Sequence, residues 1–433
     1  MKRLVTGRLH YFDPANQIVL AAAITGRPSA ADLTAAIQKA VRMHAISSSG
    51  IALDSEGNSF FTPVSQKDVP VSVRREAYDL PGLIEEQRKI PFDVRNGDFF
   101  RFFLYDLPQT TYLVVVASHL AGDGLSILYL VRDVLSALAA PNAERPVQPL
   151  RLMEDFGYPA DSEPAPLARF ILRRINRAWN RQKRVFGFDE YLLLFDSYWQ
   201  THAVQLASSE LSGPDLSALV AKCKSAGVTI NSAIAAALLS ALQTSDVGMA
   251  VSVRPDGYEG MGNYASGIST QYRWNDKESF WDNARSIHEI IHKKLGDNRK
   301  KYYVLQSLKR LEPTLIDSMY FSLYADFPNK TAQRMLDLSK YSERRRHTTS
   351  ITNLARPDIP VVYGSYTLDS IEFVPPLIAT SRSMLGVVTV GSRMTLTMQY
   401  EKSDRSRDYE TALGQTVRIL KSAASGDEPV GRE

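Results

Sequence analysis

Residues Thr111–Ser126 read TYLVVVASHLAGDGLS, and this stretch decides how the rest of the chain is interpreted. The run from Leu113 to Ala117 is apolar and rich in valine, as expected of a strand in the middle of a sheet. The residue that follows such a strand emerges at the carboxyl edge of the sheet, where open α/β folds form their crevices. The sequence therefore predicts that His119 lies at the edge of a crevice.

Two glycines flank Asp123 in the turn after the strand. Gly122 and Gly124 accept backbone dihedrals that other residues avoid, so the chain is expected to reverse and begin a helix near Leu125. His119 and Asp123 would then lie at opposite ends of one tight turn. An imidazole has a pKa near neutrality and can take a proton from a hydroxyl or amine. The alternative is structural, with Asp123 capping the next helix and His119 hydrogen-bonded at a strand end.

The composition is that of a globular protein without disulfides. The chain has 433 residues, of which 44% are hydrophobic, enough for two or three domains. Its net charge of +4 neither demands nor excludes an anionic partner. We expect no nucleic-acid partner and a monomer. The single cysteine, Cys223, excludes an intramolecular disulfide and a cysteine metal cluster, and we interpret it as a small core residue.

The start of the sequence does not have the pattern of a signal peptide. The segment MKRLVTGRLHYFDPANQ lacks the apolar core of a signal peptide, and no uninterrupted apolar run is long enough to span a bilayer. We therefore predict a cytoplasmic protein without a transmembrane segment, with contact to a membrane surface left open.

The order of predicted elements indicates an α/β (α+β) fold in two halves. Proline-rich residues 141–166 are the best linker, and a basic amphipathic helix is predicted over 167–188. From Ser209 a strand and helix pattern restarts and runs to Tyr400. We divide the chain into an N-terminal subdomain (1–165), a crossing segment (166–205), a C-terminal subdomain (206–425) and a disordered tail (426–433). The elements expected in the first half are a strand over 17–25, a helix capped by Ser29, a hairpin of strands 99–106 and 111–119, and a helix over 125–138.

His119, Asp123 and Gly124 spell HxxxDG, and this segment resembles the motif of the chloramphenicol acetyltransferase-like superfamily. That superfamily includes peptide-synthetase condensation domains, plant-type acyltransferases, wax ester synthases and polyketide-associated acyltransferases. Further segments resemble the superfamily in the same order along the chain. They are 91–103 (PFDVRNGDFFRFF), 228–242 (VTINSAIAAALLSAL), 250–255 (AVSVRP), 261–269 (MGNYASGIS) and 350–360 (SITNLARPDIP).

The resemblance implies an acyltransferase built of two similar subdomains in a V, with the active-site tunnel between them. A thioester donor, either acyl-CoA or a phosphopantetheinyl acyl or peptidyl carrier protein, would enter from one face. A small-molecule alcohol or amine acceptor from secondary or lipid metabolism would enter from the other. His119 would deprotonate the acceptor for direct attack, with no bound cofactor and no acyl-enzyme. Ser118 stands where peptide-forming members carry a second histidine, which favours simple O- or N-acyl transfer.

The same resemblance implies which residues support the motif. Asp123 would point away from the substrate and pair with Arg254, which lies in the segment matching the superfamily's arginine. Asn263, Tyr264 and Asn353 would contact substrate. Two alternatives remain: a catalytically silent condensation-like domain that binds a carrier protein, and a metallopeptidase.

The metallopeptidase alternative rests on His288 and His292, which with Glu289 fit HExxH and would share one helix face. Glu312 would be a third zinc ligand. The lysines that follow would repel a cation, so we favour a helix with incidental histidines and expect no metal. The basic runs 169–184 and 344–346 would meet coenzyme A phosphates, an acidic carrier protein or anionic lipid, or would simply be solvated.

Overall fold

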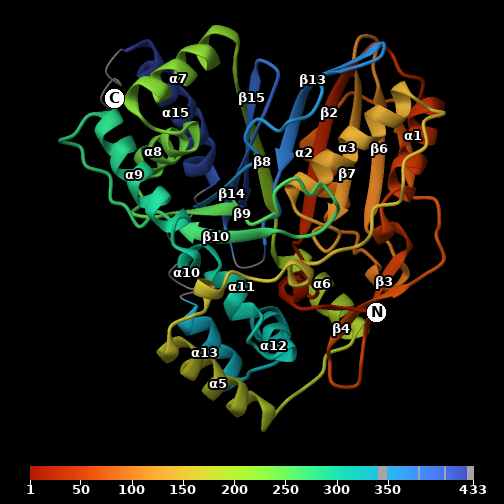
Figure 1. Cartoon of the computed structure of the whole chain (residues 1–433), viewed down its shortest axis with the longest axis vertical. Coiled ribbons are helices and arrows are strands. Elements are labelled where there is room, and N and C mark those ends of the chain that lie inside the picture. Colours follow the sequence, from red (N-terminus) through yellow and green to blue (C-terminus); the bar gives the residue numbers. More distant parts are fainter. Residues whose placement is uncertain (340–348, 379–380, 404–405, 427–433) are drawn as a thin grey trace.

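The structure, a computed structural model, describes residues 1–339, 349–378, 381–403 and 406–426. In these residues the chain forms two six-stranded sheets and one small sheet, with a separate hydrophobic core at each large sheet (Figure 1). The predicted mixed α/β fold is confirmed. The strands of the first sheet lie in the order β12 (Val362–Tyr363), β13 (Tyr366–Val374), β2 (Gln17–Thr25), β7 (Thr111–Ser118), β6 (Phe100–Asp106) and β5 (Val71–Arg74). Those of the second sheet lie in the order β10 (Ala265–Ser269), β9 (Val247–Ser252), β11 (Thr349–Asn353), β14 (Ser383–Val390), β15 (Arg393–Glu401) and β8 (Val204–Ser212). The small sheet consists of β1 (Lys2–Leu4), β4 (Ser59–Pro63) and β3 (Ser49–Leu53).

The first sheet is built as its sequence predicts. Strand β7 lies between β2 and β6, and its residues from Leu113 to Ala117 are fully buried. β6 and β7 form the predicted antiparallel hairpin. Two helices cover the outer side of this sheet, α1 (Ala30–Arg42) and α3 (Gly124–Ala139), and the Ser29 side chain caps α1 as expected. His119 therefore lies directly after a central, rigid strand, β7.

Strand β13 crosses from the second half of the sequence to the first sheet. It belongs to the second half of the sequence, yet it pairs antiparallel with β2 along residues 367–374 and so extends the first sheet. The Thr395 hydroxyl on β15 donates to the Ile371 carbonyl on β13, which ties this crossing strand to the second sheet. The long apolar edge of β2 is therefore covered by a strand from the second half of the sequence.

The second sheet carries its helices on the opposite side of the molecule (Figure 1). They are α7 (Gly213–Ala226), α8 (Ile230–Leu242), α9 (Phe280–Leu295) and α15 (Ser406–Ser425). Within the described residues no single helix has the length and apolarity of a membrane span. Among the described helices, α7 and α8 taken together meet that criterion, but they are bent by 99° at their junction. Residues 233–239 of α8 are fully buried in the second core.

The crossing segment contains two helices instead of the one predicted over 167–188. α5 (Pro166–Asn180) ends early, and α6 (Phe188–Thr201) follows it. The break allows Phe186 to stack on Phe321 of α12 (Pro313–Tyr324), with the ring centroids 3.9 Å apart, and the Phe186 side chain is almost completely buried. The remaining helices are α2 (Leu80–Gln87), α4 (Met153–Phe156), α10 (Asn298–Lys301), α11 (Tyr303–Leu308), α12 (Pro313–Tyr324) and α13 (Lys330–Leu338), with 3₁₀ turns η1 (Thr6–His10), η2 (Ala45–Ser48), η3 (Val94–Asn96) and η4 (Ala160–Ser162).

Candidate active site

His119 lies in the turn between β7 and α3, held by contacts at both its backbone and its ring. Its backbone N–H donates to the carbonyl of Asn16, at 2.9 Å. Its ring Nδ1 lies 3.1 Å from the carbonyl oxygen of Gly122. A carbonyl only accepts hydrogen bonds, so Nδ1 must carry the proton of the neutral ring and Nε2 must hold the free lone pair. Burial lowers the pKa of His119 below its usual 6.5, so the ring is a neutral base at pH 7.

A second histidine, His10, is stacked on His119, and the sequence analysis missed it. The ring centroids are 4.0 Å apart and the rings are inclined by 20°. His10 ends η1, is buried, and its Nδ1 has no hydrogen-bond partner in the described structure. Burial, followed by the proximity of His119, lowers the pKa of His10 well below 6.5. No local pattern marks His10, because its place at the site depends on a contact between distant parts of the sequence.

The paired histidines predict an acid-sensitive contribution to stability. Both folded-state pKa values lie below the unfolded value of 6.5, so the unfolded chain binds more protons as the pH falls. The contribution of the two neutral histidines to the free energy of unfolding is complete above pH 6.5, and it is lost as the pH falls through their folded-state pKa values. His10→Phe keeps a flat ring but removes one titrating group. The free energy of unfolding in urea would be measured between pH 5 and 8. As the pH falls, it is expected to decrease less steeply for His10→Phe than for the parent chain, by up to about 1.4 kcal/mol per pH unit. An equal dependence on pH in the two proteins would contradict the titration of His10.

Asp123 is both the cap of α3 and the partner of Arg254. Its Oδ1 accepts the N–H of Ser126 at 2.9 Å and lies 2.7 Å from Arg254 Nη2. Its Oδ2 accepts the backbone N–H of Tyr264 at 2.9 Å. Arg254 also donates from Nη1 to the Gly260 carbonyl at 2.7 Å. The implied ion pair is therefore present, and it joins the turn after β7 to the loop between β9 and β10 in the second half.

The glycines of the turn are needed for close packing and not for unusual dihedrals. Neither Gly122 nor Gly124 has a positive φ, so the predicted reason for them was wrong. A Cβ on Gly124 would lie 2.8 Å from the ring of Phe373 on β13 and 2.9 Å from Leu354. A Cβ on Gly122 would lie 2.5 Å from that of Ser126. The start of α3 is thus pressed against side chains from the second half of the chain.

This contact makes Gly124→Ala a destabilising change. The added methyl must displace the Phe373 ring, and such overpacking costs about 1–3 kcal/mol. Gly414→Ala is the matched control, because that glycine is exposed on α15 and its Cβ would meet no atom within 4 Å. Thermal unfolding is expected to show a lower Tm for Gly124→Ala and an equal or higher Tm for Gly414→Ala. Equal Tm values for Gly124→Ala and the parent chain would contradict the packing argument.

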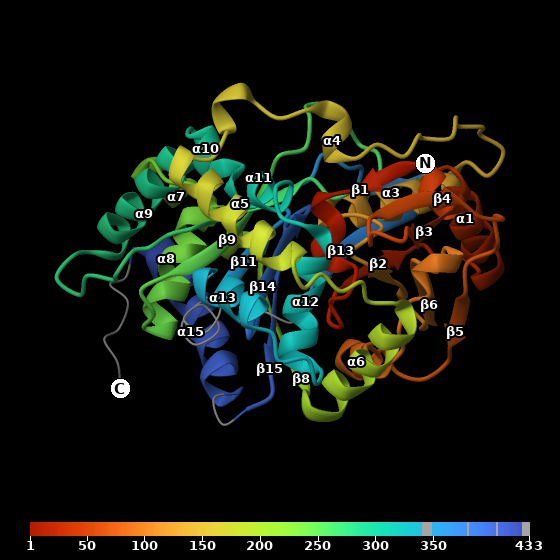
Figure 2. The same ribbon diagram turned by 90° about the horizontal axis from the view of Figure 1, so that it is seen from below.

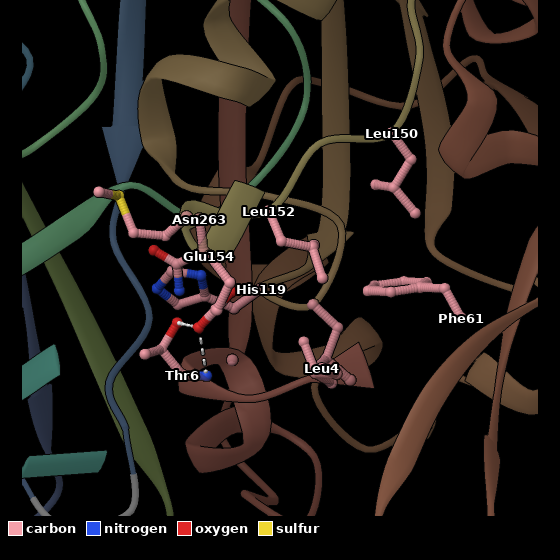
Figure 3. A pocket seen from close by; sticks show the side chains of 11 residues that line it. Leu4, Thr6, Phe61, His119, Leu150, Leu152, Glu154 and Asn263 are labelled. Atoms are coloured by element: carbon pink, nitrogen blue, oxygen red, sulfur yellow. Dashed lines mark hydrogen bonds between the residues drawn. The ribbon is translucent and has the colours of Figure 1, made fainter. Parts of the chain in front are cut away.

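A small cavity, with room for about one water molecule, lies beside His119 (Figure 3). Its wall is mostly apolar, with Leu4 and Phe61 from the small sheet among the lining residues. Glu154 of α4 also lines the cavity and accepts hydrogen bonds from the backbone N–H and the hydroxyl of Thr6, at 3.1 and 3.0 Å. His119 is thus a basic group in a largely hydrophobic pocket.

The predicted linker covers this cavity. Leu150, Leu152, Met153 and Glu154 belong to the proline-rich segment, and all four line the space around His119. Figure 2 shows the segment running along the outside of the molecule from the first sheet to the second half. Regular structure in it is short, as predicted, but the segment is part of the site and not a spacer between domains.

The three predicted substrate contacts lie in different places. Asn263 lines the cavity with His119. Tyr264 does not, because its side chain is fully buried and its hydroxyl donates to the Arg151 carbonyl; its role in the structure is the backbone contact to Asp123. Asn353 also lies outside the cavity lining, and its amide donates to Asn231 at the start of α8, at 3.3 Å.

The HExxH segment forms part of α9, and its two histidine rings lie 4.0 Å apart. His288 Nδ1 accepts the backbone N–H of Thr229 at the start of α8, at 3.3 Å. Glu312, the suggested third ligand, instead accepts the N–H of Thr314 at 2.8 Å and contacts Lys183 at 3.0 Å. In the described part of the chain no three His, Cys, Asp or Glu side chains are grouped as a metal ion would require.

Cys223 and the two basic runs were also considered in the sequence analysis. Cys223 is buried in the second core, and burial raises the pKa of its thiol to about 12, as expected of a core residue. Arg173, Arg174 and Arg177 are exposed on α5. The second basic run, 344–346, and the tail from 427 lie outside the described residues.

The arrangement of sheets and site defines a known fold. The first condensation domain of the CDA synthetase superposes with a TM-score of 0.63 at 13% identity, covering 100% of this chain and 97% of that one. SgcC5 from Streptomyces globisporus gives 0.61 at 15% identity, covering 98% and 99%. Polyketide synthase associated protein 5 from Mycobacterium tuberculosis gives 0.60 at 12% identity, covering 97% of each. The chain therefore has the fold of these condensation domains over its whole length.

Sequence comparison is more limited. No protein-family model matches the chain. A stretch of 128 residues is 30% identical to the hybrid PKS-NRPS synthetase LUC5 from Fusarium sp., which corresponds to 29% of this chain and 3% of that protein. The chain thus resembles a small part of a much larger synthetase in sequence, and condensation domains over its whole length in fold.

Proposed function

We propose that the chain transfers an acyl group from a thioester to a hydroxyl or amine of a small molecule, with His119 as the general base. The observation that carries this proposal is the contact between His119 Nδ1 and the Gly122 carbonyl, which leaves Nε2 as the lone-pair nitrogen in a mostly apolar cavity. The condensation-domain fold supports a role of this kind in the assembly of secondary metabolites.

In the proposed reaction the acceptor oxygen or nitrogen attacks the thioester carbonyl while its proton passes to Nε2 of His119. The carbon–sulfur bond then breaks, the leaving sulfur takes that proton, and the products are an ester or amide and a free thiol. Asp123 and Arg254 hold the turn that positions the ring. Since the cavity wall is mostly apolar, the acyl part of the donor is expected to be hydrophobic.

Thiol release tests this function. The full chain would be incubated with acyl-CoA thioesters of graded chain length, and separately with an acyl carrier protein, each with and without pooled alcohols and amines. Release that increases with acceptor, together with detection of the ester or amide by mass spectrometry, is the expected result. Absence of release from both donor types would overturn the proposal in favour of a silent domain that binds carrier proteins. Zinc content of the purified chain would be measured in parallel.

A further inference from the structure

The hydrogen bond of the His119 ring fixes only one of its atoms. Nδ1 lies 3.1 Å from the Gly122 carbonyl oxygen. This single contact leaves the ring free to turn about it, because the second side-chain torsion of a histidine has a broad range. The direction in which Nε2 points therefore depends on what lies against the face of the ring.

His10 lies against that face. The two ring centroids are 4.0 Å apart and the ring planes are inclined by 20°, so the rings are stacked. The His10 residue is 8% exposed, and its Nδ1 is buried without a hydrogen-bond partner in the described structure. What His10 offers to His119 is therefore the flat surface of its ring.

The turn that carries His10, η1, is anchored to α12 in the second half of the chain. Arg8 Nε donates to Asp317 Oδ1 at 2.9 Å, and each of these two side chains is 1% exposed. The Tyr320 hydroxyl donates to the Leu9 carbonyl at 2.8 Å. An ion pair buried this deeply is costly to separate, so η1 has little freedom to move. His10 is thus held beside His119 by a fixed support.

Asn16 joins the backbones of the two histidines. Its side-chain amide donates to the His10 carbonyl at 2.5 Å, and its own carbonyl accepts the His119 N–H at 2.9 Å. Asn16 is 7% exposed. The positions of both rings are therefore determined by buried backbone contacts as well as by the stacking itself.

We propose that His10 is a positioning residue for His119: its ring fixes the plane of the His119 ring and so sets the direction of Nε2. The catalytic consequence rests on the proposed function, in which Nε2 takes the proton of the acceptor. His119 then becomes positively charged, and a neutral aromatic ring against its face is compatible with that charge, whereas a second cation would repel it. Burial keeps the pKa of His10 well below 6.5, so this ring is neutral at pH 7.

Nuclear magnetic resonance of the full chain with isotope-labelled histidine tests the positioning without relying on activity. The His119 ring signals, assigned by their loss in His119→Ala, are expected to show NOEs to the His10 ring and a shift caused by its ring current. His10→Phe is expected to keep such a shift. His10→Leu is expected to abolish it and to leave the His119 ring mobile. Absence of the NOEs in the parent chain, or an equally ordered His119 ring in His10→Leu, would overturn the proposal.

Acyl-transfer kinetics measure the catalytic consequence. His10→Leu is expected to lower kcat about 10²-fold with KM unchanged, as misplacement of a catalytic group does. His10→Phe, which keeps a flat ring, is expected to retain most of the parental kcat. His202→Leu is the matched control, because His202 is also stacked, on Tyr198 with centroids 4.1 Å apart, but does not line the His119 cavity. A parental kcat in His10→Leu would contradict the positioning role.

The two readouts separate this proposal from the proposed function. A parent chain that shows the NOEs but no acyl transfer, with a His119 ring that becomes mobile in His10→Leu, would overturn acyl transfer and support the positioning of His119. If His10→Leu does not fold, His10→Met, which fills the space without a flat ring, takes its place in both measurements. If neither variant folds, the NOEs and the ring-current shift in the parent chain decide the proposal.

Discussion

Replacing His119 by alanine is expected to lower the rate of acyl transfer by about 10²- to 10⁴-fold, the usual contribution of a positioned general base. The reason is that Nε2 is the nitrogen left to accept the acceptor's proton once Nδ1 is bound to the Gly122 carbonyl. Single-turnover thiol release with a saturating donor and acceptor measures the effect on the chemical step.

His288→Ala is the matched control for this prediction. His288 also accepts a backbone hydrogen bond, but it lies on α9 in the HExxH segment and does not line the cavity. The His288 variant is expected to retain the parental rate. If the His119 variant kept the parental rate, or if the His288 variant lost more of the rate, His119 would not be the general base. The histidines of the HExxH segment on α9 would then be the candidates.

Asp123→Ala is expected to lose about 3–5 kcal/mol of unfolding free energy, because it leaves the buried Arg254 charge without its partner. It also removes the cap of α3 and the acceptor for the Tyr264 N–H, so acyl transfer is expected to fall with stability. Denaturant unfolding measures the first effect. The exposed pair of Arg42 and Asp68 provides the control, since Asp68→Ala is expected to cost no more than about 1 kcal/mol.

A double-mutant cycle separates the ion pair from the cap. Removing Arg254 in the Asp123 variant takes away the stranded charge, so Asp123→Ala with Arg254→Met is expected to be less destabilised than the sum of the single changes. The residual loss then reports the cap and the Tyr264 contact. Strict additivity of the two substitutions would mean that the charges do not stabilise one another, despite the 2.7 Å separation of their atoms.

Local patterns in the sequence were enough to predict the elements that carry the site. β2, the Ser29-capped α1, the β6–β7 hairpin and α3 each have a periodic apolar face and clear turn or cap residues, so their bounds follow from neighbouring residues alone. The pairing of Asp123 with Arg254 was reached through the resemblance of two separate segments to one superfamily. The residues that neighbour Asp123 and Arg254 in the sequence do not by themselves predict that pair.

Features that depend on distant contacts escaped prediction. The place of His10 at the site and the position of residues 150–154 beside the cavity depend on segments that are distant in the sequence, so no neighbouring residue predicts them. The helix predicted over 167–188 ends at Asn180 although helix-compatible residues follow, because burial of Phe186 against Phe321 outweighs local propensity. The Gly124 case is similar, since the constraint comes from Phe373 on another strand.

The crossing of β13 into the first sheet has a consequence for how the chain acquires its structure during synthesis. The long edge of β2 stays without a partner until residue 374 has left the ribosome, so the first sheet cannot be completed while the N-terminal half is being made. An isolated fragment of residues 1–205 would expose that edge to pairing with other chains and would tend to aggregate. The two halves are therefore one cooperative folding unit, in which the last third of the polypeptide closes the sheet begun by the first.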